Sequence, residues 1–157
     1  MTTRVNAASY VKSGFGQAML ALQREVETSG LEHKLLELVK LRASQINGCA
    51  YCLDMHSKDA RALGETEQRI YTLDAWRETP FFSDRERAAL EWAEAVTRVS
   101  IDHVPDRVYD AVKPFFTEAE LVALTFAVVT INSWNRLAIS FRAPVGSYVS
   151  PHAAAHA

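Results

Sequence analysis

The chain contains only two cysteines among its 157 residues. That is too few for the disulfide framework of a small secreted domain. Its six glycines do not form a glycine-rich phosphate-binding loop. Basic residues are not in excess either, because 17 Lys and Arg stand against 19 Asp and Glu, for a formal net charge of -2. The overall charge therefore favours neither nucleic acid nor an anionic membrane as a partner, since both call for a basic surface.

Long hydrophobic runs are also missing. The longest uncharged run, Leu121 to Asn135, is broken by threonine, asparagine and serine, and it is shorter than the ~20 apolar residues of a membrane span. Residues 1–16 lack the unbroken apolar core of a signal peptide. We therefore expect a cytoplasmic protein without a membrane segment. In that compartment a close pair of cysteines is more often catalytic or metal-binding than structural.

Strand-like alternation is absent, and helical periods dominate the chain. The sequence predicts one all-α domain over residues 1–157, with a core at about 15–142 and an extended or disordered tail at 143–157. Expected helices lie at about 15–28, 31–46, 49–63, 67–73, 83–97, 105–113 and from 117 to at least 137. Two of them begin with capping boxes, at Ser83–Glu86 and Thr117–Glu120, in which side chains satisfy free backbone N–H groups.

Both cysteines lie in the segment INGCAYCLDMH, residues 46–56. On a helix, Cys49, Cys52 and His56 fall at i, i+3 and i+7 and therefore share one face. Cys49 follows Gly48 at the expected helix start, where free N–H groups and the helix dipole favour a thiolate. His56 is the nearest base, with an unperturbed pKa of ~6.5. This arrangement is typical of a redox dithiol with a proton acceptor one turn away.

A carboxylate that orients the imidazole would complete a proton relay. Glu37 is the candidate, because it lies within the largely apolar second helix, although a structural ion pair with Lys40 or Arg42 explains it equally well. Three other interpretations of these residues stay open. In the first, the cysteines are inert core residues, and in the second His56 is a solvated surface histidine. In the third, zinc is bound by Cys49, Cys52, His56 and Glu37. The zinc site is disfavoured because structural sites usually pair CxxC with a second, distant ligand pair.

The run ELVKLRASQINGCAYCLDMHSKDARALGE, residues 37–65, resembles the core of the alkyl hydroperoxidase D (AhpD-like) family, within the carboxymuconolactone decarboxylase superfamily. The later runs FSDRERAALEWAEAVT and INSWNRLAISFR are also similar to this family, and the resemblance covers most of residues 15–142. It implies an all-helical bundle that assembles into homo-oligomers, with a hexamer built as a trimer of dimers preferred over a trimer. It also implies thiol-dependent reduction of hydroperoxides, an antioxidant activity.

The resemblance also implies residue roles. Cys52 would attack the peroxide, and Cys49 would donate a proton and then resolve the sulfenic acid as a Cys49–Cys52 disulfide. Glu37 and His56 would relay protons. No metal or other cofactor is implied, and an external dithiol, of lipoyl type in this family, would reduce the disulfide. The helix dipole alone favours Cys49 as the more acidic thiol, so the sequence leaves the order of acidity open.

Tyr51 is a departure from the family pattern, because the best-known peroxidase of the family has a histidine just before the second cysteine. Tyrosine, with a pKa of ~10, donates hydrogen bonds but is a poor base at neutral pH. Tyr51 is therefore an accessory candidate only, and it keeps open a non-peroxidatic dithiol–disulfide reductase or redox sensor. A zinc-stabilised interaction module is the third hypothesis. The decarboxylase branch of the superfamily is disfavoured, since its lactone chemistry needs no dithiol.

Overall fold

The computed structural model describes residues 2–152, and within this range it contains helices and connecting segments but no strand. The all-α prediction is confirmed. The helices in chain order are α1 (Ala7–Val11), α2 (Gly14–Glu27), α3 (His33–Asn47), α4 (Ala50–Ala62), α5 (Glu67–Thr72), the 3-10 helix η1 (Leu73–Glu78), α6 (Asp84–Thr97), α7 (Val99–Asp102), α8 (Asp106–Val112) and α9 (Glu118–Phe141).

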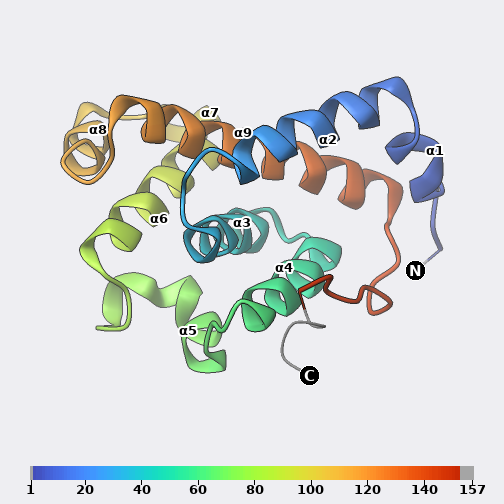
Figure 1. Cartoon of the computed structure of the whole chain (residues 1–157), viewed down its shortest axis with the longest axis horizontal. Coiled ribbons are helices and arrows are strands. Elements are labelled where there is room, and N and C mark those ends of the chain that lie inside the picture. Colours follow the sequence, from blue (N-terminus) through green and yellow to red (C-terminus); the bar gives the residue numbers. More distant parts are fainter. Residues whose placement is uncertain (1, 153–157) are drawn as a thin grey trace.

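Helix α3 occupies the centre of the molecule. It packs against α4, α6 and α9, and Figure 1 shows it nearly end-on with the other helices around it. Leu36, Leu38 and Val39 are all fully buried although they point in different directions from the helix axis. The apolar circumference of this helix thus corresponds to burial on all sides, as the sequence predicts. Glu37 lies in this central helix, which puts a carboxylate inside the fold.

Local signals position the helix ends. The capping boxes at Ser83 and Thr117 are both present, with the reciprocal hydrogen bonds to Glu86 and Glu120. Gly48 ends α3 with φ of 67° and ψ of 35°, a left-handed conformation that glycine adopts without steric cost. The chain thereby turns directly from α3 into α4, and the carboxylate of one helix can approach the cysteines of the next.

Large apolar side chains remain exposed on α2 and on α9 of the single chain. The spacing of Phe15, Met19, Leu22 and Val26 predicts one apolar stripe along α2, but Phe15 is 89% exposed, whereas Val26 at the other end of the stripe is buried. Helix α9 buries one face against α2, α3 and α6 and exposes Val122, Phe126 and Val129 on the other. Over one window α9 has a mean hydropathy of 1.3, long and apolar enough to cross a membrane by length and composition alone. Here its buried face belongs to the core of the fold.

The segment after α9 is extended and returns along α4. Figure 1 shows this red segment leaving the end of α9 and running down to α4. Tyr148 contacts α4 through hydrogen bonds of both its carbonyl and its hydroxyl group. Residues 143–152 of the predicted tail are therefore held against the domain, and residues 153–157 lie outside the described residues.

Candidate active site

The two cysteines lie at the start of α4 and form a disulfide bond. Cys49 is the N-cap residue of α4, and its sulfur accepts a hydrogen bond from the backbone N–H of Cys52 at 3.4 Å. Each cysteine is only 1% exposed. The expected Cys49–Cys52 pairing is thus present, and the helix terminus provides backbone N–H groups that favour negative charge on a sulfur atom.

Glu37 and His56 form a buried pair between α3 and α4. His56 Nδ1 lies 2.8 Å from Glu37 Oε2, and Lys40 Nζ donates to Glu37 Oε1 at 2.8 Å. Glu37 is only 6% exposed. Burial raises the pKa of its carboxyl, but the bonds and charges of His56 and Lys40 outweigh that effect and lower the pKa from 4.5 to about 2. An ionised carboxylate can only accept hydrogen bonds, so Nδ1 carries the hydrogen and Nε2 is left to exchange a proton.

The structure also decides between the two ion-pair partners that the sequence allowed for Glu37. Lys40 pairs with it, whereas Arg42 turns to another network and donates to Glu94 at 2.7 Å. The ion pair does not replace the contact with the imidazole, because each carboxylate oxygen has its own partner. The structural and the catalytic interpretation of Glu37 are therefore compatible.

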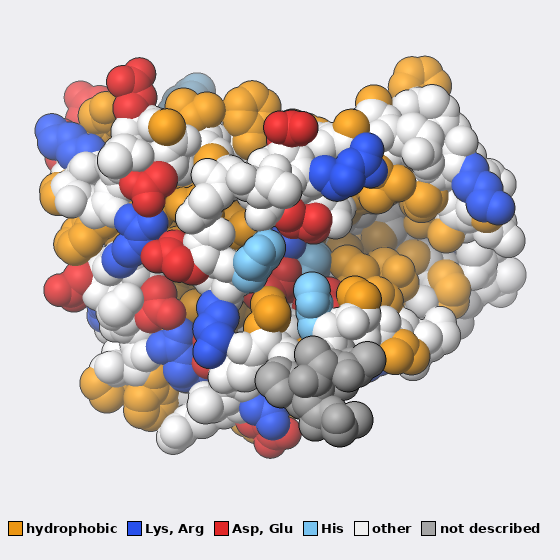
Figure 2. Space-filling model, in the orientation of Figure 1, with side chains coloured by type: hydrophobic (Ala, Val, Ile, Leu, Met, Phe, Trp, Pro, Cys, Tyr) orange, Lys and Arg blue, Asp and Glu red, His pale blue; other side chains and the backbone are white. Residues whose placement is uncertain are grey.

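A cavity of about 320 Å³ opens beside this pair. Helices α1, α2, α4 and α9 line it with mostly apolar side chains, and Figure 2 shows hydrophobic side chains gathered in the hollow on the right of the view. Cys52 and His56 both contribute to the lining, as does Tyr51, whereas Cys49 does not. A small molecule in the cavity would therefore meet the sulfur of Cys52 and the imidazole one turn further along α4.

Two further residues complete the site and were not predicted from the sequence. Asp59 is buried on α4, one turn after His56, and the Tyr148 hydroxyl donates to its two carboxylate oxygens at 2.9 and 3.0 Å. Tyr148 also lines the cavity. The spacing of Asp59 from His56 was a usable signal, since residues at i and i+3 share a helix face. Tyr148 gave no such signal, because it lies outside any periodic segment.

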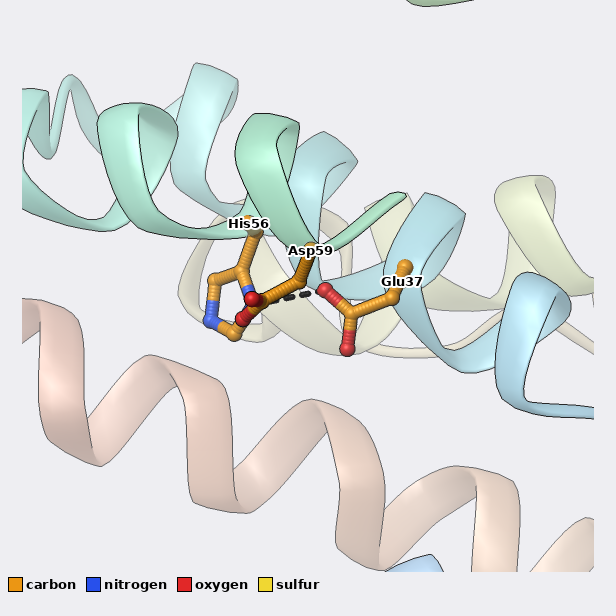
Figure 3. Close-up of side chains that lie close together, drawn as sticks. All are labelled: Glu37, His56 and Asp59. Carbon is orange, nitrogen blue, oxygen red and sulfur yellow. Dashed lines mark hydrogen bonds and ion pairs between the residues drawn. The ribbon is translucent and has the colours of Figure 1, made fainter. Parts of the chain in front are cut away.

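The side chains that could jointly hold a metal ion differ from the predicted zinc set. Ligand atoms of Glu37, His56 and Asp59 lie within 4.8 Å of one another, and Figure 3 shows the three side chains converging from α3 and α4. The cysteine sulfurs, joined to each other, do not belong to this group. Lys40 places an ammonium group directly on Glu37, and this positive charge opposes cation binding there.

Comparison with known proteins identifies the family. Residues 14–95 match the model of the carboxymuconolactone decarboxylase family. The chain belongs to this family. The uncharacterized protein YdfG of Bacillus subtilis is 42% identical over 140 residues, which span 89% of this chain and 95% of YdfG. The uncharacterized Escherichia coli protein YnjA is 35% identical over 102 residues, or 64% of this chain and 55% of YnjA.

Solved structures place this chain among the AhpD-like members of the family. The Agrobacterium tumefaciens protein ATU0492, a protein of unknown function named as a candidate antioxidant defence protein AhpD, superposes with a TM-score of 0.88 at 42% identity. That match covers 94% of this chain and 100% of ATU0492. The debrominase Bmp8 shares the fold at a TM-score of 0.73 and 18% identity, over 90% of this chain and 74% of Bmp8. The AhpD-like resemblance of the sequence is thereby confirmed, and Bmp8 shows that the fold also occurs in a protein of another activity.

Proposed function

We propose that this protein is a thiol-dependent peroxidase that reduces hydroperoxides through Cys49 and Cys52. One observation carries the proposal. Cys52 lines an apolar cavity together with His56, and the imidazole is oriented by a buried, ionised Glu37. An oriented base beside a thiol is the general arrangement for activating a sulfur nucleophile. The AhpD-like family membership supports a peroxidase-type role at the level of the family.

The proposed cycle begins with reduced cysteines. His56 takes the proton of the Cys52 thiol, and the thiolate attacks the terminal oxygen of R–O–O–H. The O–O bond breaks, Cys52 becomes a sulfenic acid, and the proton held by the imidazole passes to the leaving alkoxide to give R–OH. The imidazole, now neutral again, takes the proton of the Cys49 thiol, and the Cys49 thiolate attacks the Cys52 sulfur. The S–S bond forms as the hydroxyl leaves, and the imidazole passes the Cys49 proton to it to give water.

Turnover requires an external dithiol that is oxidised as the Cys49–Cys52 disulfide is reduced. We propose a lipoyl-type dithiol for this step, on the strength of the family. In this scheme the peptide supplies all the groups that react with the peroxide, and neither a metal nor another cofactor takes part. The protein acts in the cytoplasm and as a homo-oligomer, with a hexamer preferred.

The Cys49→Ser and Cys52→Ser variants test the assignment. The reduced proteins are treated with cumene hydroperoxide and then with dimedone, which traps sulfenic acid, and are analysed by mass spectrometry. We expect a dimedone adduct on Cys52 in Cys49→Ser, no adduct and no peroxide consumption in Cys52→Ser, and the disulfide alone in the wild type. An unmodified Cys52 in Cys49→Ser, with peroxide not consumed by the wild type, would reject the peroxidase.

Tyr51 favours a second candidate, a dithiol–disulfide reductase or redox sensor. It is half-buried in the cavity lining, at the position where the peroxidase pattern has a histidine. With one base fewer at the site, peroxide reduction is slow while thiol–disulfide exchange remains fast, because exchange depends mainly on the thiolate. Comparing peroxide consumption with reduction of a protein disulfide, using dihydrolipoamide as the common electron donor, separates the two activities.

A further inference from the structure

The extended segment after α9 is fastened to α4 at three points. The backbone N–H of Gly146 donates to Asp54 Oδ2 at 3.2 Å, Lys58 Nζ donates to the carbonyl of Tyr148 at 3.0 Å, and the Tyr148 hydroxyl donates to Asp59. These bonds connect residues about ninety positions apart in the chain. Tyr148 is thereby held in place as part of the wall of the cavity that contains Cys52.

Asp59 is an unusual residue for the interior. The residue is 8% exposed, and within residues 2–152 its carboxylate has hydrogen bonds from the Tyr148 hydroxyl alone and no ion pair. A buried carboxylate without a cationic partner is costly. Ligand atoms of Asp59, His56 and Glu37 lie within 4.8 Å of one another, and Figure 3 shows the Asp59 carboxylate beside the imidazole ring. A protonated His56 is therefore close enough to offset its charge.

We propose that Asp59 and Tyr148 are a positioning pair for the dithiol site, in which the tyrosine hydroxyl holds the Asp59 carboxylate beside His56. This inference rests on the proposed function for the role of His56. When the imidazole takes the Cys52 proton it becomes a cation, and it then lies among two carboxylates, Glu37 and Asp59. Opposite charges this close favour the protonated ring. The pair thus stabilises the protonated imidazole of His56, which holds the Cys52 proton until the alkoxide leaves.

The donor role of Tyr148 agrees with its surroundings. Burial raises the pKa of the Tyr148 hydroxyl, and the bond to Asp59 raises it further, so the group stays protonated and continues to donate. The titratable side chains that line the cavity or contact the ring are Tyr10 of α1, Glu37 and Lys40 of α3, Tyr51, Cys52 and Asp59 of α4, and Tyr148. Helices α2 and α9 contribute only uncharged side chains to the cavity.

The first test follows the proton on His56 directly and needs no peroxide. Imidazole signals of the disulfide form are titrated by NMR, and the His56 signal is assigned by its loss in His56→Asn. In Asp59→Asn we expect the ring to release its proton at a lower pH than in the wild type. Tyr148→Phe keeps the ring of residue 148 but removes the hydroxyl, so we expect its His56 midpoint to move in the same direction, toward that of Asp59→Asn.

The second test measures the rate. Single-turnover oxidation of the reduced protein by cumene hydroperoxide should be about tenfold slower in Tyr148→Phe and in Asp59→Asn, the effect of losing one hydrogen bond to a charged group. The double variant should be no slower than Asp59→Asn, because both changes break the same contact. Tyr71→Phe is the matched control, since Tyr71 is 75% exposed and its hydroxyl contacts only Glu67 within the described chain.

The outcomes distinguish a failure of the positioning pair from a failure of the peroxidase proposal. A His56 midpoint that stays at the wild-type value in Tyr148→Phe, or rate losses that multiply in the double variant, would overturn the positioning pair. If the wild type does not react with hydroperoxides, the proposed function fails, yet the NMR midpoint still decides on the pair. Should Asp59→Asn not fold, Tyr148→Phe alone decides, since its ring still fills the same space.

Discussion

Replacing Glu37 with glutamine removes one charge from the centre of the fold. Each carboxylate oxygen accepts one charge-assisted bond, from Lys40 on one side and His56 on the other, both at 2.8 Å. These interactions outweigh burial and lower the pKa of Glu37 from 4.5 to about 2. Because a difference of one pKa unit between the folded and unfolded states corresponds to ~1.4 kcal/mol, the ionised carboxylate stabilises the fold by about 3 kcal/mol.

The sign of the pH dependence follows from the direction of this change. The pKa in the folded protein lies below that in the unfolded chain, so the stabilisation is fully present above about pH 4.5 and is lost as the pH falls toward about 2. At neutral pH we expect Glu37→Gln to lower the free energy of unfolding by about 3 kcal/mol. More than half of that difference should be gone by about pH 3, since the wild type has by then lost most of the same stabilisation.

Urea-induced unfolding of the disulfide form, followed by circular dichroism over this pH range, measures the difference. The comparison between variant and wild type cancels the contributions of Glu86, Glu94 and Glu120, whose pKa values are also lowered. Glu78→Gln serves as the control, because Glu78 is exposed. A loss below about 1 kcal/mol at neutral pH, or a loss that is the same at every pH, would refute the electrostatic account of Glu37.

Two further predictions concern the link between α3 and α4 and the surface of α9. Gly48→Ala should destabilise the protein by about 1–2 kcal/mol in the same unfolding assay, because Gly48 has a φ of 67° that alanine adopts only with strain. An added Cβ would meet no atom within 4 Å, so we expect no steric clash to add to this backbone strain. Light scattering should give wild-type protein a mass several times that of one chain, and Phe126→Asp should lower it by placing a charge on the exposed apolar face of α9. If the mass of Phe126→Asp equals that of the wild type, the exposed apolar face of α9 is not the interface between copies.

Features that depend on neighbouring residues could be predicted from the sequence. The capping boxes at Ser83 and Thr117 lie where their side-chain pattern indicates, because a cap is satisfied within one helical turn. The buried pair of Glu37 and His56 could be anticipated for a related reason. Gly48 joins the two helices by a sharp turn, so that their inner faces must meet. The 3-10 helix η1, Leu73–Glu78, was not among the helices expected from the sequence.

Features that depend on distant residues could not be predicted in this way. Periodicity places Phe15 on the apolar stripe of α2, but it does not show which helix covers that stripe, and Phe15 is left exposed. The sequence did not distinguish Lys40 from Arg42 as the ion-pair partner of Glu37. In the structure Lys40 binds Glu37, whereas Arg42 binds Glu94 of α6. The bond between Asp59 and Tyr148 depends on the path of a segment without periodicity, which tertiary contacts alone determine.

The two cysteines differ in their positions, and in the proposed cycle this difference removes the conflict between the helix dipole and the family pattern. Cys49 caps α4, where free N–H groups stabilise a thiolate, but only Cys52 lines the cavity. In the proposed cycle both outside reactants therefore meet Cys52. The peroxide is attacked by its sulfur, and the reducing dithiol later attacks the same sulfur and expels Cys49. A thiol of lower pKa leaves faster in such an exchange, so the capping position that seemed to favour Cys49 as the attacking thiol instead suits it to be the leaving group.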